Sequence, residues 1–418
     1  MLTRFIFSFI ILNTASAEFN YKLFQVTATT FEQKRALINL SKSTSNEFVE
    51  TSKVYSLTDL VLVPFEFVNA TEDYFITRGM TYEFLDPRDV LPATTFHSKH
   101  EKFSYNDFYE SQIVHKSIIK MVNCSASKPD SPVRAEIFSF GSTYLKKSML
   151  AFRLGRKDVD KEKSPVILID ATIHGNEWIG PPAAHKIIEQ LLFNATGHEL
   201  MKKFDIIVAP IVNRDGYDES LNSFHPYIHG RKNRKPTKDG CLLRRNEGTD
   251  INRNFDWFWN STELTENPCS ENFRGEYPNS EPETIALSKL METSKLIFYY
   301  TIHSYGNLIL YPYGNTDEKV HNFENMRKVA LAGKDAMEST FEIEKPYKVG
   351  SSLEILRRTS GASKDYAAGK LKIPISLIHE VGGRRPDSQP RVEDIKTYVD
   401  IVWTGFTAMA NKVAELEL

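Results

Sequence analysis

The chain has 418 residues, of which 41% are hydrophobic and 25% are charged, proportions typical of a folded protein rather than a disordered or collagen-like one. Its 52 Lys and Arg residues against 54 Asp and Glu residues give a formal net charge of -2. This lack of positive excess argues against nucleic acid as a partner and against a membrane role that depends on basic charge. The length is compatible with two or three domains, or with one large domain and an appendage.

Residues 1–17 are predicted to be a cleaved secretory signal. Arg4 supplies a basic start, residues 5–12 form a short apolar run, and residues 15–17 form a small-x-small cleavage site. An apolar run this short cannot cross a bilayer, which takes about 20 residues. The alternative to a cleaved signal is an N-terminal anchor. We therefore expect a secreted, extracellular protein without a membrane span.

The glycosylation sequons and the cysteines are compatible with the predicted secretion. The sequons, which have meaning only in a secreted protein, begin at Asn39, Asn69, Asn123, Asn194 and Asn260. Only three cysteines occur, too few for a disulfide scaffold, so a hydrophobic core must supply most of the stability. Cys241 and Cys269 flank a polar stretch and are the favoured pair for a bridge, and Cys124 is expected to be a buried thiol.

Residues 18–86 are predicted to form a small module. Strand patterns at 21–26, 48–54, 60–63 and 81–85 alternate with helical patterns at 30–40 and 65–78. The resulting order β-α-β-β-α-β describes a ferredoxin-like α/β sandwich. Residues 87–102 are predicted to be a linker, and they contain Lys99 and Lys102, at which a trypsin-like protease can cut.

Residues 103–418 are predicted to form a larger α/β domain. Four nearly continuous apolar runs, typical of strands buried on both faces, cover residues 166–171, 206–211, 296–302 and 373–378. Helical patterns lie between or after them at 182–192, 283–293, 322–338 and 395–415. In open α/β sheets, ligands bind just beyond the carboxyl ends of the strands, so the residues at those ends are the candidates for a site.

Histidine and glutamate residues stand at three of these strand ends. His174 and Glu177 follow the first run, His303 ends the third, and Glu380 ends the fourth. A similar His-x-x-Glu pair that begins at His321 lies in a charged helical stretch and is interpreted as a solvated face. Two imidazoles and one carboxylate leave a coordination position open, as in a catalytic zinc site. A further carboxylate that does not bind the metal can act as general base.

Motifs along most of the chain resemble one family, the zinc metallocarboxypeptidases of the A/B digestive type with their activation prodomain. The matching segments, in family order, are His174-Gly-Asn-Glu-Trp, Asn213-Arg-Asp-Gly, Gly230-Arg-Lys-Asn-Arg, Asp250-Ile-Asn-Arg-Asn, Tyr277-Pro-Asn-Ser-Glu, Ile302-His-Ser-Tyr, Tyr311-Pro-Tyr-Gly and Ser360-Gly-Ala-Ser-Lys-Asp. The resemblance implies a mixed, largely parallel central sheet flanked by helices, preceded by the small α/β prodomain. It also implies a secreted zymogen that is inhibited by its own prodomain and activated by a trypsin-like protease.

The same resemblance implies a role for each site residue. One zinc ion per chain would be bound by His174, Glu177 and His303, with Glu380 as general base and Arg231 at the scissile carbonyl. The remaining roles implied are substrate binding by Asn252, Arg253, Ser304, Tyr305 and Lys364, orientation of a ligand histidine by Asp250, and a loop disulfide between Cys241 and Cys269. A guanidinium such as Arg253 matches the two oxygens of a carboxylate, which favours free C-termini of peptides and proteins as substrates.

Among the positions that depart from the family pattern, two bear directly on substrate binding. Arg357 stands where a mobile tyrosine normally caps the substrate, which predicts weaker binding. Lys364 stands at the base of the pocket for the departing side chain and resembles carboxypeptidase O, which favours acidic ends. Because a buried ammonium needs a counter-charge, a substrate Asp or Glu is the predicted partner. The alternatives are that Lys364 pairs with an acidic residue of the chain or reaches solvent, and that the protein binds zinc or peptide C-termini without catalysis.

Overall fold

The computed structural model describes residues 21–30, 32–33, 35–36, 58–64, 68–85, 102–221, 230–237, 247–261, 266–293, 295–382 and 391–417. The predicted signal, nearly all of the predicted linker and Cys241 lie outside the described residues. The chain divides into two compact units, one formed mainly by residues 1–96 and the other mainly by residues 97–418. None of the described helices is long and apolar enough to cross a membrane.

The N-terminal unit contains a three-stranded antiparallel sheet in the order β2-β1-β3. Its described elements are β1 (Tyr21–Thr27), β2 (Thr58–Pro64), α2 (Val68–Ile76) and β3 (Thr81–Leu85). Phe24 and Val26 alternate on β1 and pack with Phe75 of α2, so the period-two pattern marks the buried face. The predicted strand at 48–54 and most of the helix at 30–40 lie outside the described residues, so the ferredoxin-like arrangement stays a prediction.

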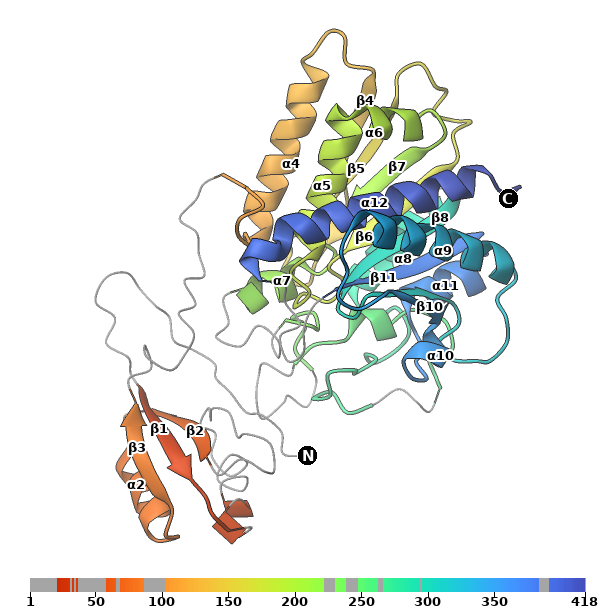
Figure 1. The fold of residues 1–418 in the computed structure, drawn as a ribbon. Helices are drawn as coiled ribbons and strands as arrows, with labels where there is room; N and C mark the ends of the chain where they lie inside the picture. Colours follow the sequence, from red (N-terminus) through yellow and green to blue (C-terminus); the bar gives the residue numbers. More distant parts are fainter. Residues whose placement is uncertain are drawn as a thin grey trace. The chain divides into compact units, whose positions relative to one another are not determined.

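The C-terminal unit is built on an eight-stranded sheet in the order β10-β9-β11-β8-β6-β7-β5-β4 (Figure 1). Its strands are β4 (Val133–Ser142), β5 (Ser148–Arg156), β6 (Val166–Ala171), β7 (Asp205–Ala209), β8 (Leu296–Ser304), β9 (Leu308–Tyr311), β10 (Lys348–Ser351) and β11 (Ile375–Val381). The four neighbouring strands β11, β8, β6 and β7 are parallel, whereas β5 pairs with β7 and β9 pairs with β11 in the antiparallel sense. The predicted mixed, largely parallel sheet is confirmed.

Helices cover both faces of this sheet (Figure 1). They are α4 (Ser111–Ala126), α5 (Gly180–Phe193), α6 (Ala195–Leu200), α7 (Arg214–Leu221), η3 (Ile251–Arg253), α8 (Pro282–Thr293), α9 (Phe323–Thr340), α10 (Ser352–Ile355), α11 (Ser363–Gly369), η4 (Val392–Asp394) and α12 (Ile395–Ala414). Val166 and Leu168 of β6 join one core cluster with Leu287 of α8 and Ala367 of α11. All six residues of β6 are buried, which explains its continuous apolar run.

The order in which successive strands are added to the sheet reverses at β6. After β6 the chain passes through α5 to β7 on one side, and it later returns to β8 on the other side. The segments that leave the carboxyl ends of β6 and β8 therefore diverge, and such a switch point is where open α/β sheets bind their ligands. Gly175 lies in the turn after β6, and a Cβ there would lie 2.3 Å from the Gly216 carbonyl carbon, so only glycine allows this close approach.

Candidate active site

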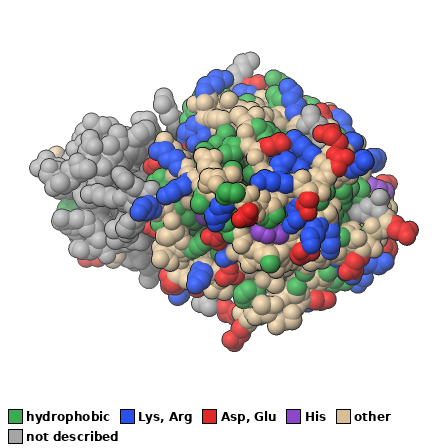
Figure 2. Space-filling model, turned by 90° about the horizontal axis from the view of Figure 1, so that it is seen from above, with side chains coloured by type: hydrophobic (Ala, Val, Ile, Leu, Met, Phe, Trp, Pro, Cys, Tyr) green, Lys and Arg blue, Asp and Glu red, His purple; other side chains and the backbone are tan. Residues whose placement is uncertain are grey.

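The predicted site residues come from separate elements that meet at the switch point. His174 and Glu177 lie in the turn between β6 and α5, His303 lies near the end of β8, and Glu380 lies near the end of β11. Asp250 immediately precedes η3. Figure 2 shows one face of the molecule on which histidine atoms are visible, with both basic and acidic side chains around them.

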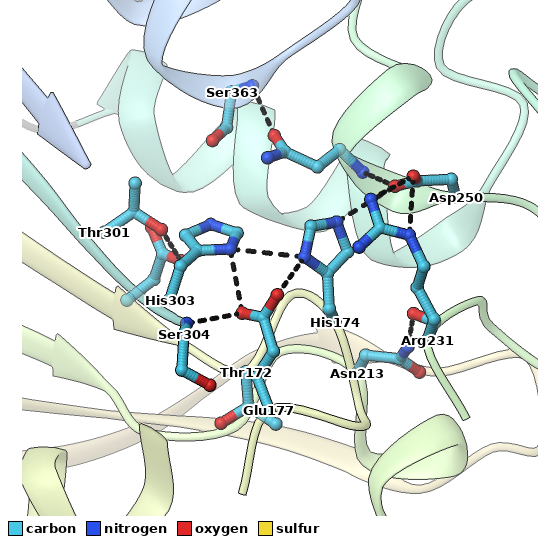
Figure 3. A network of polar contacts seen from close by, with 12 residues as sticks. Thr172, His174, Glu177, Asn213, Arg231, Asp250, Thr301, His303, Ser304 and Ser363 are labelled. Carbon is cyan, nitrogen blue, oxygen red and sulfur yellow. Dashed lines mark hydrogen bonds and ion pairs between the residues drawn. The ribbon is translucent and has the colours of Figure 1, made fainter. Parts of the chain in front are cut away.

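His174, Glu177 and His303 converge on one point (Figure 3). The Glu177 carboxylate lies 2.7 Å from His174 Nδ1 through Oε1 and 2.9 Å from His303 Nδ1 through Oε2. The two Nδ1 atoms are 3.2 Å apart, and all three side chains are buried. Although burial disfavours its charge, the two histidines hold the pKa of Glu177 below its ordinary value. Two imidazole nitrogens and a carboxylate oxygen fit a zinc ion with an open coordination position.

Asp250 fixes the orientation of one of these ligands. Its Oδ1 lies 3.2 Å from His174 Nε2, so this nitrogen carries the proton and donates while Nδ1 keeps its lone pair for a metal. Its Oδ2 accepts hydrogen bonds from Arg231 Nε at 3.1 Å and Nη2 at 2.7 Å. Burial opposes the charge of Asp250, but Arg231 and the neighbouring cations hold its pKa well below the ordinary value. One buried carboxylate thus positions both a metal ligand and the predicted carbonyl-binding cation.

The backbone of Ser304 orients the other side of the metal site. Its N–H donates to Glu177 Oε2 at 3.1 Å, so Ser304 acts on the metal ligand through its main chain. The resemblance implied substrate binding by Ser304 and Tyr305, and this role stays a prediction. Sequence reasoning did not identify the contribution of Ser304 to Glu177 or that of Asn213, whose Nδ2 donates to the Arg231 carbonyl at 3.2 Å. Neither contact has a signal in the spacing of residues.

Glu380 lies beside the metal ligands on the neighbouring strand. In the parallel pair of β11 and β8, Glu380 is the register partner of His303, so both side chains project from the same face of the sheet. Burial, together with the charge of Glu177, raises the pKa of Glu380 to about 7. A carboxyl group that titrates near neutral pH can both accept and return a proton under physiological conditions.

Asn252 and Arg253 lie in η3, directly after Asp250, and carry polar side chains. Asn252 Oδ1 accepts the backbone N–H of Ser363 at 2.8 Å, which leaves its amide nitrogen as the donor for a ligand. Arg253 Nη1 donates to the Asn252 carbonyl at 2.8 Å. Among the described residues, Arg253 makes no ion pair within 4 Å, and its side chain is only half-buried. Both residues are therefore available to bind an anionic group such as a terminal carboxylate.

Lys364 already has a counter-charge inside the protein. It lies in the first turn of α11, is 1% exposed, and pairs with the buried carboxylate of Asp365. The second oxygen of Asp365 accepts the backbone N–H of Gly314 at 3.0 Å. Of the alternatives for Lys364, pairing with an acidic residue of the chain is therefore the one observed. The premise that a substrate must neutralise this ammonium is wrong.

The described cysteines and the second His-x-x-Glu pair lie outside the cluster around Glu177. Cys269 is disulfide-bonded, and Cys241, its predicted partner, lies outside the described residues. The prediction of a buried thiol at Cys124 is wrong, because this side chain is free and exposed on α4. His321 is exposed and precedes α9, as expected for a solvated face. Within the described part of the chain, only the cluster around Glu177 has the spacing of a metal site.

Comparison with known proteins gives concordant matches. The family model described as zinc carboxypeptidase matches residues 122–405. Carboxypeptidase B from Helicoverpa zea is 34% identical over 235 residues, which cover 55% of this chain and 54% of that protein. Carboxypeptidase O from Bos taurus is 35% identical over 247 residues, which cover 58% of this chain and 63% of that protein. The matched regions therefore span less than two thirds of both relatives.

A solved structure extends the likeness of the fold to nearly the whole chain. Carboxypeptidase A from Helicoverpa armigera superposes with a TM-score of 0.67 at 22% sequence identity. The superposition covers 95% of this chain and 98% of that one. At this level of identity the likeness concerns the fold alone.

Proposed function

The chain belongs to the zinc carboxypeptidase family, and we propose that it removes the C-terminal residue from peptides and proteins with one zinc ion bound by His174, Glu177 and His303. The observation that carries this proposal is the convergence of these three buried side chains at the switch point of the sheet, with Glu380 on the adjacent strand. The bound zinc supplies a Lewis acid that polarises water or a carbonyl group. The chemistry of the protein's own residues follows from their positions.

Glu380 is assigned the proton transfers. Its pKa of about 7 allows it to accept a proton from the attacking water and then to donate it to the departing amine. Arg231 is assigned to the carbonyl oxygen, where its guanidinium stabilises the negative charge that develops during attack. Its orientation by Asp250 supports this role, because a cation held in place needs no reorganisation during the reaction.

Asn252 and Arg253 are assigned to the terminal carboxylate of the substrate. Arg253 lacks an ion-pair partner among the described residues, and the amide nitrogen of Asn252 is not used by its contact with Ser363. A guanidinium and an amide donor together match the oxygens of a carboxylate. A free C-terminus would satisfy these donors and an internal peptide bond would not, which favours an exopeptidase.

The proposal includes secretion as a zymogen. Residues 1–17 would be the signal, residues 18–86 the inhibitory prodomain, residues 87–102 the linker cut by a trypsin-like protease, and residues 103–418 the catalytic domain. The signal-like pattern at the N-terminus and the separate compactness of residues 1–96 support this organisation. A preference for acidic C-terminal residues is also kept in the proposal, although Lys364 is neutralised by Asp365.

Glu380→Gln tests the proposed chemistry. After limited trypsin treatment, the wild-type chain should contain one zinc ion and release C-terminal residues from peptides. The variant should retain the zinc and lose about 10²- to 10⁴-fold in kcat, the usual contribution of a general base. An equal rate in both proteins would overturn the role of Glu380. Peptide binding without release by the wild-type protein would instead favour the non-catalytic alternative.

A further inference from the structure

The positive charges near the proposed substrate site differ in whether the protein neutralises them. Arg231 is paired with Asp250 and Lys364 is paired with Asp365, and both carboxylates are fully buried. Arg253 and Arg357 make no ion pair within 4 Å among the described residues. These two guanidinium groups therefore carry the positive charge that remains for a ligand.

Backbone contacts place the segment that carries Arg357 against Arg253. The N–H of Gly361 donates to the Trp257 carbonyl at 3.0 Å, and the N–H of Phe255 donates to the Gly361 carbonyl at 3.1 Å. Gly361 has φ +66°, and a Cβ there would lie 2.2 Å from the Arg253 carbonyl oxygen, so the two segments touch. Burial lowers the pKa of Arg253, the charges of Asp250 and Asp365 raise it, and the charges of Arg231 and Arg357 lower it, so Arg357 is close enough for its charge to act on Arg253.

Arg357 itself is exposed, so its guanidinium is open to solvent. The side chain follows α10 and projects from the segment between α10 and Gly361. Two like charges without a shared counter-ion repel each other, and an anionic ligand that contacts both relieves this repulsion.

We propose that Arg357 is a specificity-determining residue that binds the side-chain carboxylate of a C-terminal Asp or Glu while Arg253 binds the terminal carboxylate. This inference rests on the proposed function and moves the acidic preference from Lys364 to Arg357. A C-terminal Asp or Glu presents two carboxylates close together, which matches the two unneutralised guanidinium groups in number and sign. A neutral C-terminal residue satisfies only Arg253.

The kinetic test compares Arg357→Gln with Arg358→Gln. Arg358 is the matched control because it loses the same charge one residue away, but its guanidinium donates to the Asn315 carbonyl and lies 3.9 Å from Asp317. The full chain is treated with trypsin, and kcat/KM is measured for two blocked dipeptides that end in Glu or in Gln. We expect the Glu/Gln ratio to exceed one in the wild type and to fall about tenfold in Arg357→Gln, as for one charge-assisted contact at an exposed rim.

The control should keep the wild-type ratio. A ratio that is unchanged in Arg357→Gln, or that falls equally in both variants, would overturn the assignment. High salt should lower the Glu/Gln ratio of the wild type and of Arg358→Gln but not that of Arg357→Gln, because exposed charges are screened. A salt response retained in Arg357→Gln would contradict the assignment.

A binding measurement separates failure of this inference from failure of the proposed function. Calorimetry with N-acetylglutamate and N-acetylglutamine needs no turnover. We expect N-acetylglutamate to bind about tenfold tighter to the wild type and equally to Arg357→Gln. This difference without any hydrolysis would support Arg357 and reject the exopeptidase. Hydrolysis with equal affinity for both compounds in the wild type would reject Arg357 and leave the exopeptidase intact.

Discussion

Two groups of buried histidines in the C-terminal unit differ in their partners. At the switch point, His174 and His303 face the carboxylates of Glu177 and Asp250. In the core, His185 lies 2.9 Å from the hydroxyl groups of both Tyr105 and Ser117, and His379 is similarly placed between two tyrosine hydroxyls. Carboxylates stabilise a cation or orient a metal ligand, whereas hydroxyl groups satisfy a neutral ring. The partner, and not burial, therefore separates the two groups.

The most severe change expected at the switch point is His303→Ala. It removes one of the three proposed zinc ligands and leaves the buried carboxylate of Glu177 with only one of its two histidine partners. Zinc content should therefore be lost, and the rate of hydrolysis should fall by at least about 10³-fold. Metal analysis and peptide hydrolysis provide the measurements. If His185→Gln, a change in the core group, removed zinc to the same extent, the distinction between the two groups of histidines would be wrong.

Lys364→Met tests a buried pair whose role is structural rather than ligand binding. The substitution strands the carboxylate of Asp365 without its partner, and we expect a loss of about 3–5 kcal/mol in the free energy of unfolding, measured with urea. Adding Asp365→Asn should restore most of that stability, because an amide oxygen can still accept the Gly314 N–H. Equal stability of the single and double variants would argue against the ion pair.

Asp250→Asn removes the carboxylate that distinguishes His174 from the core histidines. Loss of the charged partner should weaken zinc affinity about 10- to 100-fold, as is usual for groups that orient a metal ligand. Competition with a chelator measures this change. A zinc affinity equal to that of the wild type would show that the hydrogen bond, rather than the charge, suffices to position His174.

The core group predicts a pH dependence of stability. Burial lowers the pKa of His185 to about 3, below its unfolded value of about 6.5. Between these values the unfolded chain binds a proton that the folded chain excludes, so the contribution of His185 to stability declines as the pH falls from about 6.5 toward 3. At pH 5 the expected loss is about 2 kcal/mol relative to pH 8. Urea unfolding at both pH values should show a loss that is smaller by this amount in His185→Gln than in the wild type, because burial also lowers the pKa values of His115 and His379 to about 3 and both contribute losses of their own.

The parallel centre of the fold was predictable from the sequence, and the antiparallel edges were not. β6, β7, β8 and β11 are buried on both faces, so each leaves a nearly continuous apolar run. β4 carries Arg134 and Glu136 and is interrupted by a register shift between Ser139 and Gly141, so it shows neither a continuous run nor a clean alternation. The β4–β5 hairpin was therefore missed.

The site was predictable to the extent that its residues follow strand ends. His174, Glu177 and His303 could be associated by topology alone, whereas Asp250 is 76 residues from His174 and was expected only from the family resemblance. The Lys364–Asp365 pair had no sequence signal, because adjacent residues on a helix do not normally face each other. Long, flexible side chains can fold back at a helix start, and only coordinates reveal it.

Asp250 has a consequence for any ligand that engages Arg231. Its two oxygens connect the imidazole of His174, the proposed zinc ligand, with the guanidinium of Arg231. We expect an anion that draws Arg231 toward itself to alter the affinity of His174 for metal through Asp250, and because linkage is reciprocal, metal then alters the affinity for that anion by the same factor. Inhibitors of this protein should therefore be ranked with the zinc concentration held fixed, because inhibitor affinity and metal affinity are coupled through Asp250.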